Sequence, residues 1–313
     1  MKEPALDCEV APSSSCAVVA PRDHVVRDTL ITALAPLAWG ATYLVTSQFL
    51  PPNRPLLLGV LRALPVGIVF TLRSGRLPSG IWWWRFLVLG ILNVGAAFAL
   101  LFLVAYRLPG GVGGTLSATQ PLVVVFLAWL VLGERPTAQK VLAAAIGFVG
   151  VSLLVLGHIT HLDVAGLTAG LCQPFIIGMG TVLTQRWGRP LPLLAFTGWQ
   201  LVVGGVMLAP FAFLLEGPLP HFTTVNVLSL AYLAVFGTGV AYFAWFRGIE
   251  RISASSAAFL VLLVPVIAAG LDSLVLHRHL RPIQLFGIAM VLVSVFAVTR
   301  SAARARRDDA PPA

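Results

Sequence analysis

Ten apolar segments, each about as long as a membrane-crossing helix, occupy most of this 313-residue chain. A helix needs about 20 mostly apolar residues to cross the hydrocarbon core of a bilayer. Short gaps that contain charged residues, proline, glycine or asparagine separate the segments. The segments cover about residues 30–50, 56–72, 84–105, 112–132, 138–157, 164–185, 192–215, 225–247, 253–276 and 282–300. We therefore predict an all-α membrane protein with ten transmembrane helices.

The composition excludes an ordinary soluble protein. Only 11% of the residues are charged and 58% are hydrophobic, whereas a soluble domain has about 25% charged residues. The net charge of +9 would suggest nucleic acid as a partner of a soluble protein. Here the basic residues lie in the short gaps and in the segment 300–307. We therefore expect the lipid bilayer as a partner, and no nucleic acid.

The distribution of Lys and Arg predicts the orientation of the chain in the membrane. With a cytoplasmic N-terminus, sixteen of the 21 basic residues fall in inside segments, four fall in outside segments, and Arg62 falls within a span. Cytoplasmic loops carry the excess of positive charge in membrane proteins. We predict a multi-pass protein of the cell (inner or plasma) membrane with both termini in the cytoplasm. Residues 1–29 form a disordered cytoplasmic arm in this prediction, and residues 301–313 form a cytoplasmic tail.

The chain contains an internal repeat of five spans, over residues 30–157 and 164–300. A shift of 138 aligns the early part of each half, and a shift of 144 aligns the later part. The matched pairs include Pro36 with Pro174, Gly67 with Gly205, Gly95 with Gly239 and Pro121 with Pro265. An odd number of spans makes the second half enter the membrane from the opposite side. Inverted repeats are typical of secondary transporters, whose substrate site lies near the midplane between the halves.

Two polar turns mark the same place in each half. They read VLGERPTAQK at residues 131–140 and VLHRHLRPIQ at residues 275–284. The first turn is expected between spans four and five on the cytoplasmic side, and the second between spans nine and ten on the outer side. The alignment places Glu134 on Arg278, so the two turns share a position but differ in charge.

Four motifs resemble the EamA-type branch of the drug/metabolite transporter superfamily. They are WGATYLVT (39–46), LRALPVG (61–67), the run YRLPGGVGGTLSATQPLVVVFLAWLVLGE (106–134) and its counterpart RISASSAAFLVLLVPVIAAGLDSLVL (251–276). The resemblance covers about residues 30–300. It implies an exporter of amino acids or related small metabolites. It also implies a central cavity lined by spans one to four and six to nine, with spans five and ten at the periphery. Family members often repeat the Leu-Gly-Glu ending in the second half, and this chain departs from that pattern at residues 276–278.

Two charged residues lie inside predicted spans more than two residues from either end. A charge near the centre of a span costs at least about 2.5–3.5 kcal/mol, so Arg62 is expected to face protein or water. It is a candidate partner for a substrate carboxylate. The alternative is an Arg62 side chain that reaches outward or bonds to carbonyl groups of neighbouring helices. Its repeat counterpart is Gln200. Asp272, near the outer end of span nine, is a candidate coupling residue or a member of a structural ion pair.

Aromatic and amide side chains provide further candidates for a substrate site. Trp39, Tyr43 and Thr46 share a helix face in span one, as do Thr238, Tyr242 and Trp245 in span eight. A mostly apolar site with a few polar groups suits amino acids or amphipathic metabolites, although such aromatic faces also serve helix packing. The other candidates for substrate binding are Asn93, Gln120, Gln173, Trp199 and Gln200.

Proline residues inside spans four and nine are candidate hinges. Pro121 and Pro265 each remove a backbone hydrogen bond and kink the helix, which serves either alternating access or a static bend. No ATPase, catalytic or metal-binding motif is present, so we expect no enzyme activity and no cofactor. The predicted function is secondary active transport by alternating access. The two alternatives are a multidrug or quaternary-ammonium exporter of the same fold and a non-transporting membrane scaffold. The sequence indicates a small-molecule substrate and no particular oligomeric state.

Overall fold

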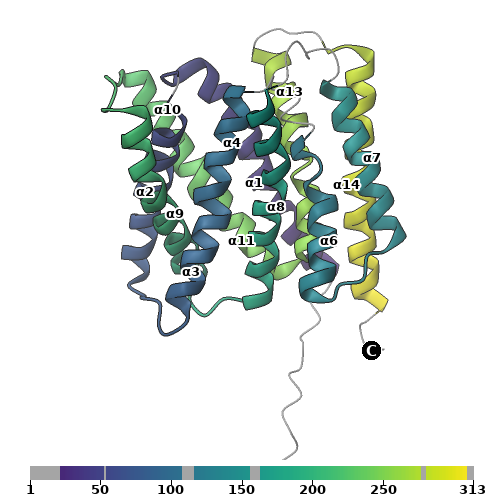
Figure 1. Ribbon diagram of the computed structural model, residues 1–313. Coiled ribbons are helices and arrows are strands. Elements are labelled where there is room, and N and C mark those ends of the chain that lie inside the picture. Colours follow the sequence, from purple (N-terminus) through teal and green to yellow (C-terminus); the bar gives the residue numbers. More distant parts are fainter. Residues whose placement is uncertain (1–21, 53, 108–115, 156–162, 276–279, 309–313) are drawn as a thin grey trace, which may run out of the picture.

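The computed structural model describes residues 22–52, 54–107, 116–155, 163–275 and 280–308, and every regular element within these ranges is a helix. The first half contains α1 (Arg22–Phe49), α2 (Pro55–Ser74), α3 (Trp82–Gly90), the π-helix η1 (Ile91–Gly95), α4 (Ala96–Arg107), α6 (Gln120–Leu132) and α7 (Ala138–Val155). The second half contains α8 (Val164–Trp187), α9 (Leu193–Glu216), α10 (Thr224–Ala234), the π-helix η2 (Val235–Val240), α11 (Ala241–Arg251), α12 (Ala254–Leu260), α13 (Leu263–Val275) and α14 (Pro282–Asp308). This arrangement confirms the predicted all-α class (Figure 1).

The helices account for the ten predicted spans. Eight helical runs are long and apolar enough to cross a membrane, and two shorter apolar helices cover residues 120–132 and 138–153. The bounds differ most at the ends of the chain, where α1 begins at Arg22 and α14 continues to Asp308. Basic side chains at a helix end reach water along their own length, so they do not have to end the helix. The remainder of the predicted arm and tail, residues 1–21 and 309–313, lies outside the described residues.

The packing of the helices follows the repeat. α2 packs along α9 at one edge of the bundle, and α7 packs along α14 at the other edge (Figure 1). α1 of the first half packs against α11 and α13 of the second, and α8 of the second half packs against α4 and α6 of the first. The two halves therefore exchange their first helices in the same way. This pairing confirms the predicted inverted repeats, and it confirms spans five and ten at the periphery.

Glycines allow the close contact between α2 and α9. A Cβ atom on Gly67 would lie 2.8 Å from the backbone N of Val202, and one on Gly205 would lie 2.5 Å from Cγ of Leu64. Gly67 and Gly205 are repeat equivalents, and so are Leu64 and Val202. Small residues let helix backbones approach in a membrane, where no hydrophobic effect drives helices together.

Both halves interrupt the same spans in the same places. The π-helices η1 and η2 lie inside spans three and eight, and their first residues, 91 and 235, differ by the repeat shift of 144. Span four has a turn at residues 118–119, and span nine has one at residues 261–262. Pro121 and Pro265 therefore lie in the first turn of α6 and α13, where a missing N–H costs little. Sequence reasoning placed these prolines inside continuous spans, and the turns before them were not expected.

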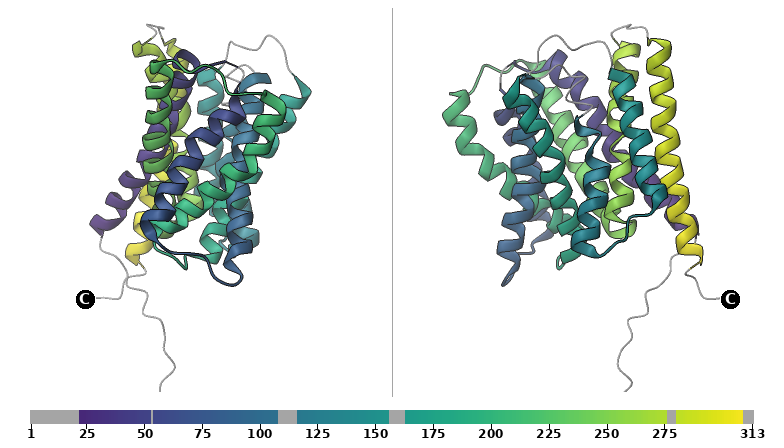
Figure 2. Two further views of the ribbon diagram at one scale, coloured as in Figure 1. Left: turned by 90° about the vertical axis from the view of Figure 1, so that its left-hand side faces the viewer. Right: turned by 45° about the vertical axis from the view of Figure 1, so that its right-hand side comes forward.

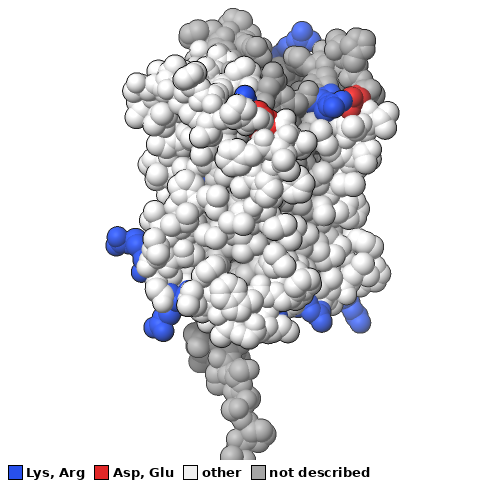
Figure 3. Space-filling model, turned by 60° about the vertical axis from the view of Figure 1, so that its left-hand side comes forward, with Lys and Arg blue, Asp and Glu red and all other residues white. Residues whose placement is uncertain are grey.

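On the face of the molecule shown in Figure 3, charged side chains lie toward the two ends of the bundle, and an uncharged band lies between them. α1 begins and α14 ends at the same end, which is the lower end in Figure 2. We call this end the terminal face and the other end the opposite face. Such a band is what a bilayer requires of a multi-pass membrane protein, because charged groups are costly in its hydrocarbon core.

Candidate functional site

Arg62 lies buried within α2, with 3% of its surface exposed. Its Nε donates a hydrogen bond to Oγ1 of Thr238 at 2.9 Å, and its Nη2 donates one to the carbonyl oxygen of Gly237 at 3.0 Å. The guanidinium carbon lies 5.1 Å from the centre of the Phe98 ring, which is a cation–π distance. Arg62 therefore points into the second half of the chain, and these three partners are uncharged.

Gln200, the repeat counterpart of Arg62, lies fully buried in α9. Its Oε1 accepts a hydrogen bond from Nδ2 of Asn93 at 2.8 Å, and the same Nδ2 donates to Oγ1 of Thr184 at 3.2 Å. Asn93 belongs to the π-helix η1 of the first half, whereas Gln200 and Thr184 belong to the second half. This cluster is polar and carries no charge.

The two π-helices supply repeat-equivalent carbonyl groups to these clusters. A π-helical turn breaks the regular i to i−4 hydrogen bonding of an α-helix and is frequent at functional sites. The carbonyl of Gly237 in η2 accepts from Arg62, and the carbonyl of Asn93 in η1 accepts from Oη of Tyr242 at 3.1 Å. Gly237 and Asn93 are related by the shift of 144. Each carbonyl thus receives a side-chain donor from the opposite half.

We define two half-sites from these contacts. The charged half-site comprises Arg62, Thr238 and the Gly237 carbonyl, and the amide half-site comprises Asn93, Thr184 and Gln200. The rings of Phe98 and Tyr242 connect them, because Phe98 lies under Arg62, Tyr242 donates to Asn93, and the two ring centres are 6.2 Å apart. Phe98 and Tyr242 are also repeat equivalents. The cluster therefore contains equivalent positions from both halves of the repeat.

Aromatic side chains of α1 and α11 meet beside the half-sites. The ring of Trp39 lies 5.6 Å from the ring of Tyr242 and 5.3 Å from that of Trp245. Tyr242 and Trp245 are buried and Trp39 is half-buried. The structure thus brings together six of the residues predicted for substrate binding: Trp39, Arg62, Asn93, Gln200, Tyr242 and Trp245.

Other predicted residues make different contacts. Gln120 is buried at the start of α6, and Gln173 of α8 is buried and accepts a hydrogen bond from Oγ of Ser117 at 3.3 Å. Trp199 donates from Nε1 to the carbonyl of Arg76 at 3.0 Å. That bond holds Trp199 near the end of α2 at the terminal face. The side chains of Tyr43 and Asp272 lie outside the described part of the chain.

Sequence reasoning missed two members of the cluster, Thr184 and Phe98. The repeat alignment carried a signal for both, since Thr184 aligns with Thr46 and Phe98 aligns with Tyr242. The π-helices had no signal in hydropathy, because a single wide turn leaves the apolar character of the span unchanged.

Comparison with known proteins agrees with this architecture. The model of the EamA-like transporter family matches residues 29–156 and again residues 164–300. Protein PecM of Dickeya dadantii is 41% identical over 281 residues, which cover 89% of this chain and 94% of that protein. The uncharacterized transporter YvbV of Bacillus subtilis is 26% identical over 285 residues, which cover 89% of this chain and 93% of that protein.

A solved crystal structure shares the fold. It superposes with a TM-score of 0.76 at 22% sequence identity and covers 91% of this chain and 99% of its own. The two family matches cover the two halves of the chain, and the gap between them lies at the predicted repeat boundary. The chain therefore belongs to the EamA-like transporter family, a family of membrane transporters and not of enzymes.

Proposed function

We propose that this transporter moves small molecules that carry an anionic group, foremost amino acids and related metabolites, by alternating access. The substrate's anionic group binds at Arg62, and its other polar groups bind at the amide half-site. The rings of Trp39, Tyr242 and Trp245 form an aromatic wall for the apolar part of the substrate, and Tyr43 remains a predicted contact. Gln120, Gln173 and Trp199 remain predicted contacts in other states of the cycle, and Asp272 remains the predicted coupling residue.

The observation that carries this proposal is the buried guanidinium with uncharged partners. Removing a cation from water costs several kcal/mol unless an opposite charge compensates for it. Among the described side chains, four ion pairs join an Asp or Glu residue to a basic residue, and Arg62 takes part in none of the four. A substrate carboxylate supplies the missing charge, and the planar guanidinium matches its geometry.

The asymmetry of the two half-sites supports a substrate with two different ends. The charged half-site favours an anion, whereas the amide half-site offers donors and acceptors without net charge. Hydrogen bonds to Gly237 and Asn93 are already formed, so the substrate exchanges partners with the protein instead of meeting bare polar groups. Such exchange keeps the cost of binding and release low.

The membrane orientation in this proposal follows the positive-inside rule. The terminal face carries the larger share of Lys and Arg, so it is assigned to the cytoplasm. Both termini then lie in the cytoplasm of a cell whose inner or plasma membrane holds the protein. Export is the direction that the family resemblance favours.

Transport by proteoliposomes tests the assignment of Arg62. In vesicles loaded with labelled amino acids, Arg62→Ala should lower transport at least about 30-fold, because a buried hydrogen-bonded charge pair is worth about 2 kcal/mol or more. Arg281→Ala, which removes the same kind of side chain from an exposed position, should transport normally. Unchanged transport by a folded Arg62→Ala protein would remove Arg62 from the site.

The alternative function is a multidrug or quaternary-ammonium exporter of the same fold, which would take a cationic substrate. Arg62 repels such a substrate, so Arg62→Ala should leave or raise its transport. A thermal-shift screen against amino acids, nucleosides and cationic drugs separates the classes, since a ligand that binds the native state raises its stability. A protein that moves none of these compounds would favour the non-transporting scaffold.

A further inference from the structure

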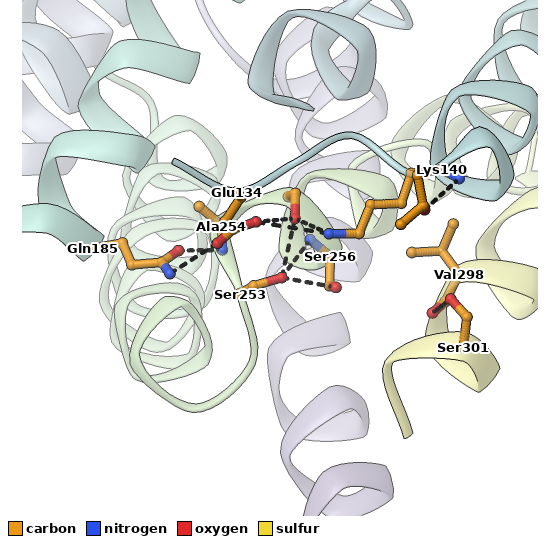
Figure 4. A network of polar contacts seen from close by, with 10 residues as sticks. Glu134, Lys140, Gln185, Ser253, Ala254, Ser256, Val298 and Ser301 are labelled. Carbon is orange, nitrogen blue, oxygen red and sulfur yellow. Dashed lines mark hydrogen bonds and ion pairs between the residues drawn. The ribbon is translucent and has the colours of Figure 1, made fainter. Parts of the chain in front are cut away.

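A polar network joins the two halves at the terminal face, apart from the half-sites. Glu134, in the turn between α6 and α7, accepts a hydrogen bond from Oγ of Ser255 at 2.8 Å and one from Nε2 of Gln185 at 3.2 Å (Figure 4). Nζ of Lys140 lies 3.7 Å from the Glu134 carboxylate and donates to Oγ of Ser255 at 2.7 Å. Glu134 and Lys140 belong to the first half, and Gln185 and Ser255 belong to the second.

The network fixes the start of α12 in place. Oε1 of Gln185 accepts a hydrogen bond from the backbone N of Ala254 at 2.5 Å. Oγ of Ser253 accepts one from the backbone N of Ser256 at 3.1 Å, as a helix cap does. α12 is the first segment of the broken span nine, and the turn at residues 261–262 separates it from α13. The first half of the chain therefore holds α12 in place, and the helix is broken directly after α12.

An ion pair makes a second tie between the halves at the same face. Nη2 of Arg247, near the end of α11, lies 2.7 Å from Oδ1 of Asp28, near the start of α1. Asp28 is 2% exposed. Ion pairs that are partly shielded from water contribute more than exposed surface pairs, because solvent screens them less.

The residues of these ties have no chemically equivalent residues at the opposite face. The positions equivalent to Asp28 and Arg247 are Gly166 and Leu103, which carry no charge. The positions equivalent to Glu134, Lys140 and Ser255 are 278, 284 and 111, which are Arg, Gln and Gly. In an inverted repeat, the contacts that close one face have their counterparts at the other. Among the described residues at the opposite face, the Arg107–Asp163 ion pair also joins the halves, but its side chains are 54% and 36% exposed, so it is weaker than the shielded Asp28–Arg247 pair.

The edge formed by α2 and α9 differs, because it is held at both faces. The carboxylate of Glu216 accepts from the backbone N atoms of Leu56 and Leu57 at 2.6 and 2.9 Å at the opposite face. Trp199 bonds to the Arg76 carbonyl at the terminal face. This edge is therefore a fixed pair, and the Glu134 network and the Asp28–Arg247 pair lie elsewhere in the bundle.

We propose that the Glu134 network and the Asp28–Arg247 pair form a lock, which must break each time the site opens at the terminal face. The transporter then rests closed at this face, and the energy needed to break the lock limits how often it opens there. The residues of the lock set the rate and the resting state of the transport cycle without contacting substrate. The proposal rests on membership of the transporter family, and it requires no particular substrate or membrane orientation.

Cysteine labelling tests the lock without substrate. Ala258 on α12 and Val123 on α6 belong to one buried apolar cluster between the halves. In a protein whose Cys8, Cys16 and Cys172 are replaced by Ser, Ala258→Cys or Val123→Cys reports access to this cluster. We expect Glu134→Ala to raise the rate of maleimide labelling at both reporters about fivefold, because losing about 1 kcal/mol shifts a two-state equilibrium by that factor. Adding Arg247→Gln should raise it further.

Two controls separate opening from a general loosening of the fold. Arg107→Gln breaks an exposed ion pair with Asp163 at the opposite face and should leave labelling at both reporters unchanged. Ala169→Cys reports a buried position between α4 and α8 near the opposite face, and Glu134→Ala should not raise its labelling. Equal increases at residues 169 and 258 would overturn the proposal, and so would unchanged labelling in the double variant.

Discussion

The two repeats share a backbone framework but carry different chemistry at the centre. Gly67 and Gly205 form the same close contact in both halves, and η1 and η2 widen the same turn. At equivalent positions near the centre, one half has Arg62 and the other has Gln200. Helix packing needs the same geometry twice, whereas a substrate with two different ends needs two different half-sites.

This difference shows that helix packing constrains some positions of the repeat and substrate binding constrains others. A position that sets helix separation has to satisfy its neighbours in both halves, since the halves exchange their first helices. A position that faces the centre can carry a different side chain in each half, as Arg62 and Gln200 do. Substitutions at framework positions should therefore act alike in the two repeats, and substitutions in the half-sites should act differently.

The framework positions should show the largest effect. Gly67→Leu and Gly205→Leu should each destabilise the protein by about 3 kcal/mol, because a larger side chain cannot enter so close a contact without moving the backbone. Gly270→Leu is the control, since a Cβ atom at Gly270 would meet no atom within 4 Å. Thermal unfolding in detergent measures all three. A strong effect at one framework glycine and none at the other would show that the repeats do not share this contact.

The half-sites should respond with opposite signs. Arg62→Gln removes a buried charge and keeps an N–H donor for the Gly237 carbonyl, so it should stabilise the protein by about 1–3 kcal/mol while transport is lost. Gln200→Leu leaves the buried amide of Asn93 with one acceptor fewer, so it should destabilise by about 1–3 kcal/mol. Denaturation of the two variants, side by side with wild type, measures both changes. Destabilisation by Arg62→Gln would mean that the charge is compensated in the resting protein.

The sequence predicted the parts of the fold that depend on hydropathy and duplication. Apolar length located the spans, because a bilayer fixes how many residues a helix needs. The shared shifts of 138 and 144 located the repeat, and they paired Arg62 with Gln200 before any contact was known. The resemblance to the EamA-type family implied both membership of the transporter family and the peripheral position of spans five and ten, which are α7 and α14.

The interruptions and the polar contacts were beyond sequence reasoning. The turn before Pro121 lies among the small and polar residues 117–120, which a continuous helix would also accept, so the sequence does not mark a break there. Thr184 and Phe98 look like ordinary packing residues until the exchange of first helices brings them to the half-sites. Asp28, assigned to a disordered arm, is buried in α1 by its pairing with Arg247. Such contacts depend on three-dimensional neighbours that a linear pattern does not contain.

The first helices of the two repeats also begin differently, and this difference should have the smallest effect. Asp163 caps α8 by accepting a hydrogen bond from the backbone N of Gly166 at 2.8 Å, whereas the equivalent position in α1 is Val25. The bond to Gly166, and then the neighbouring Arg107 guanidinium, lower the pKa of the Asp163 carboxyl. A lowered pKa stabilises the fold above the unfolded value of about 3.9. That stabilisation is lost as pH falls through the folded value.

Replacement of Asp163 therefore separates the cap from the charge. Asp163→Ala should lower the melting temperature slightly at neutral pH, and the difference from wild type should narrow as pH falls below about 4. Asp163→Asn keeps a capping oxygen but loses the ion pair with Arg107. Because the cap is the larger contribution to the lowered pKa, Asp163→Asn should melt closer to wild type than Asp163→Ala does. The reverse order would assign the effect to Arg107, and the two repeats would then differ at this end through an ion pair instead of a helix cap.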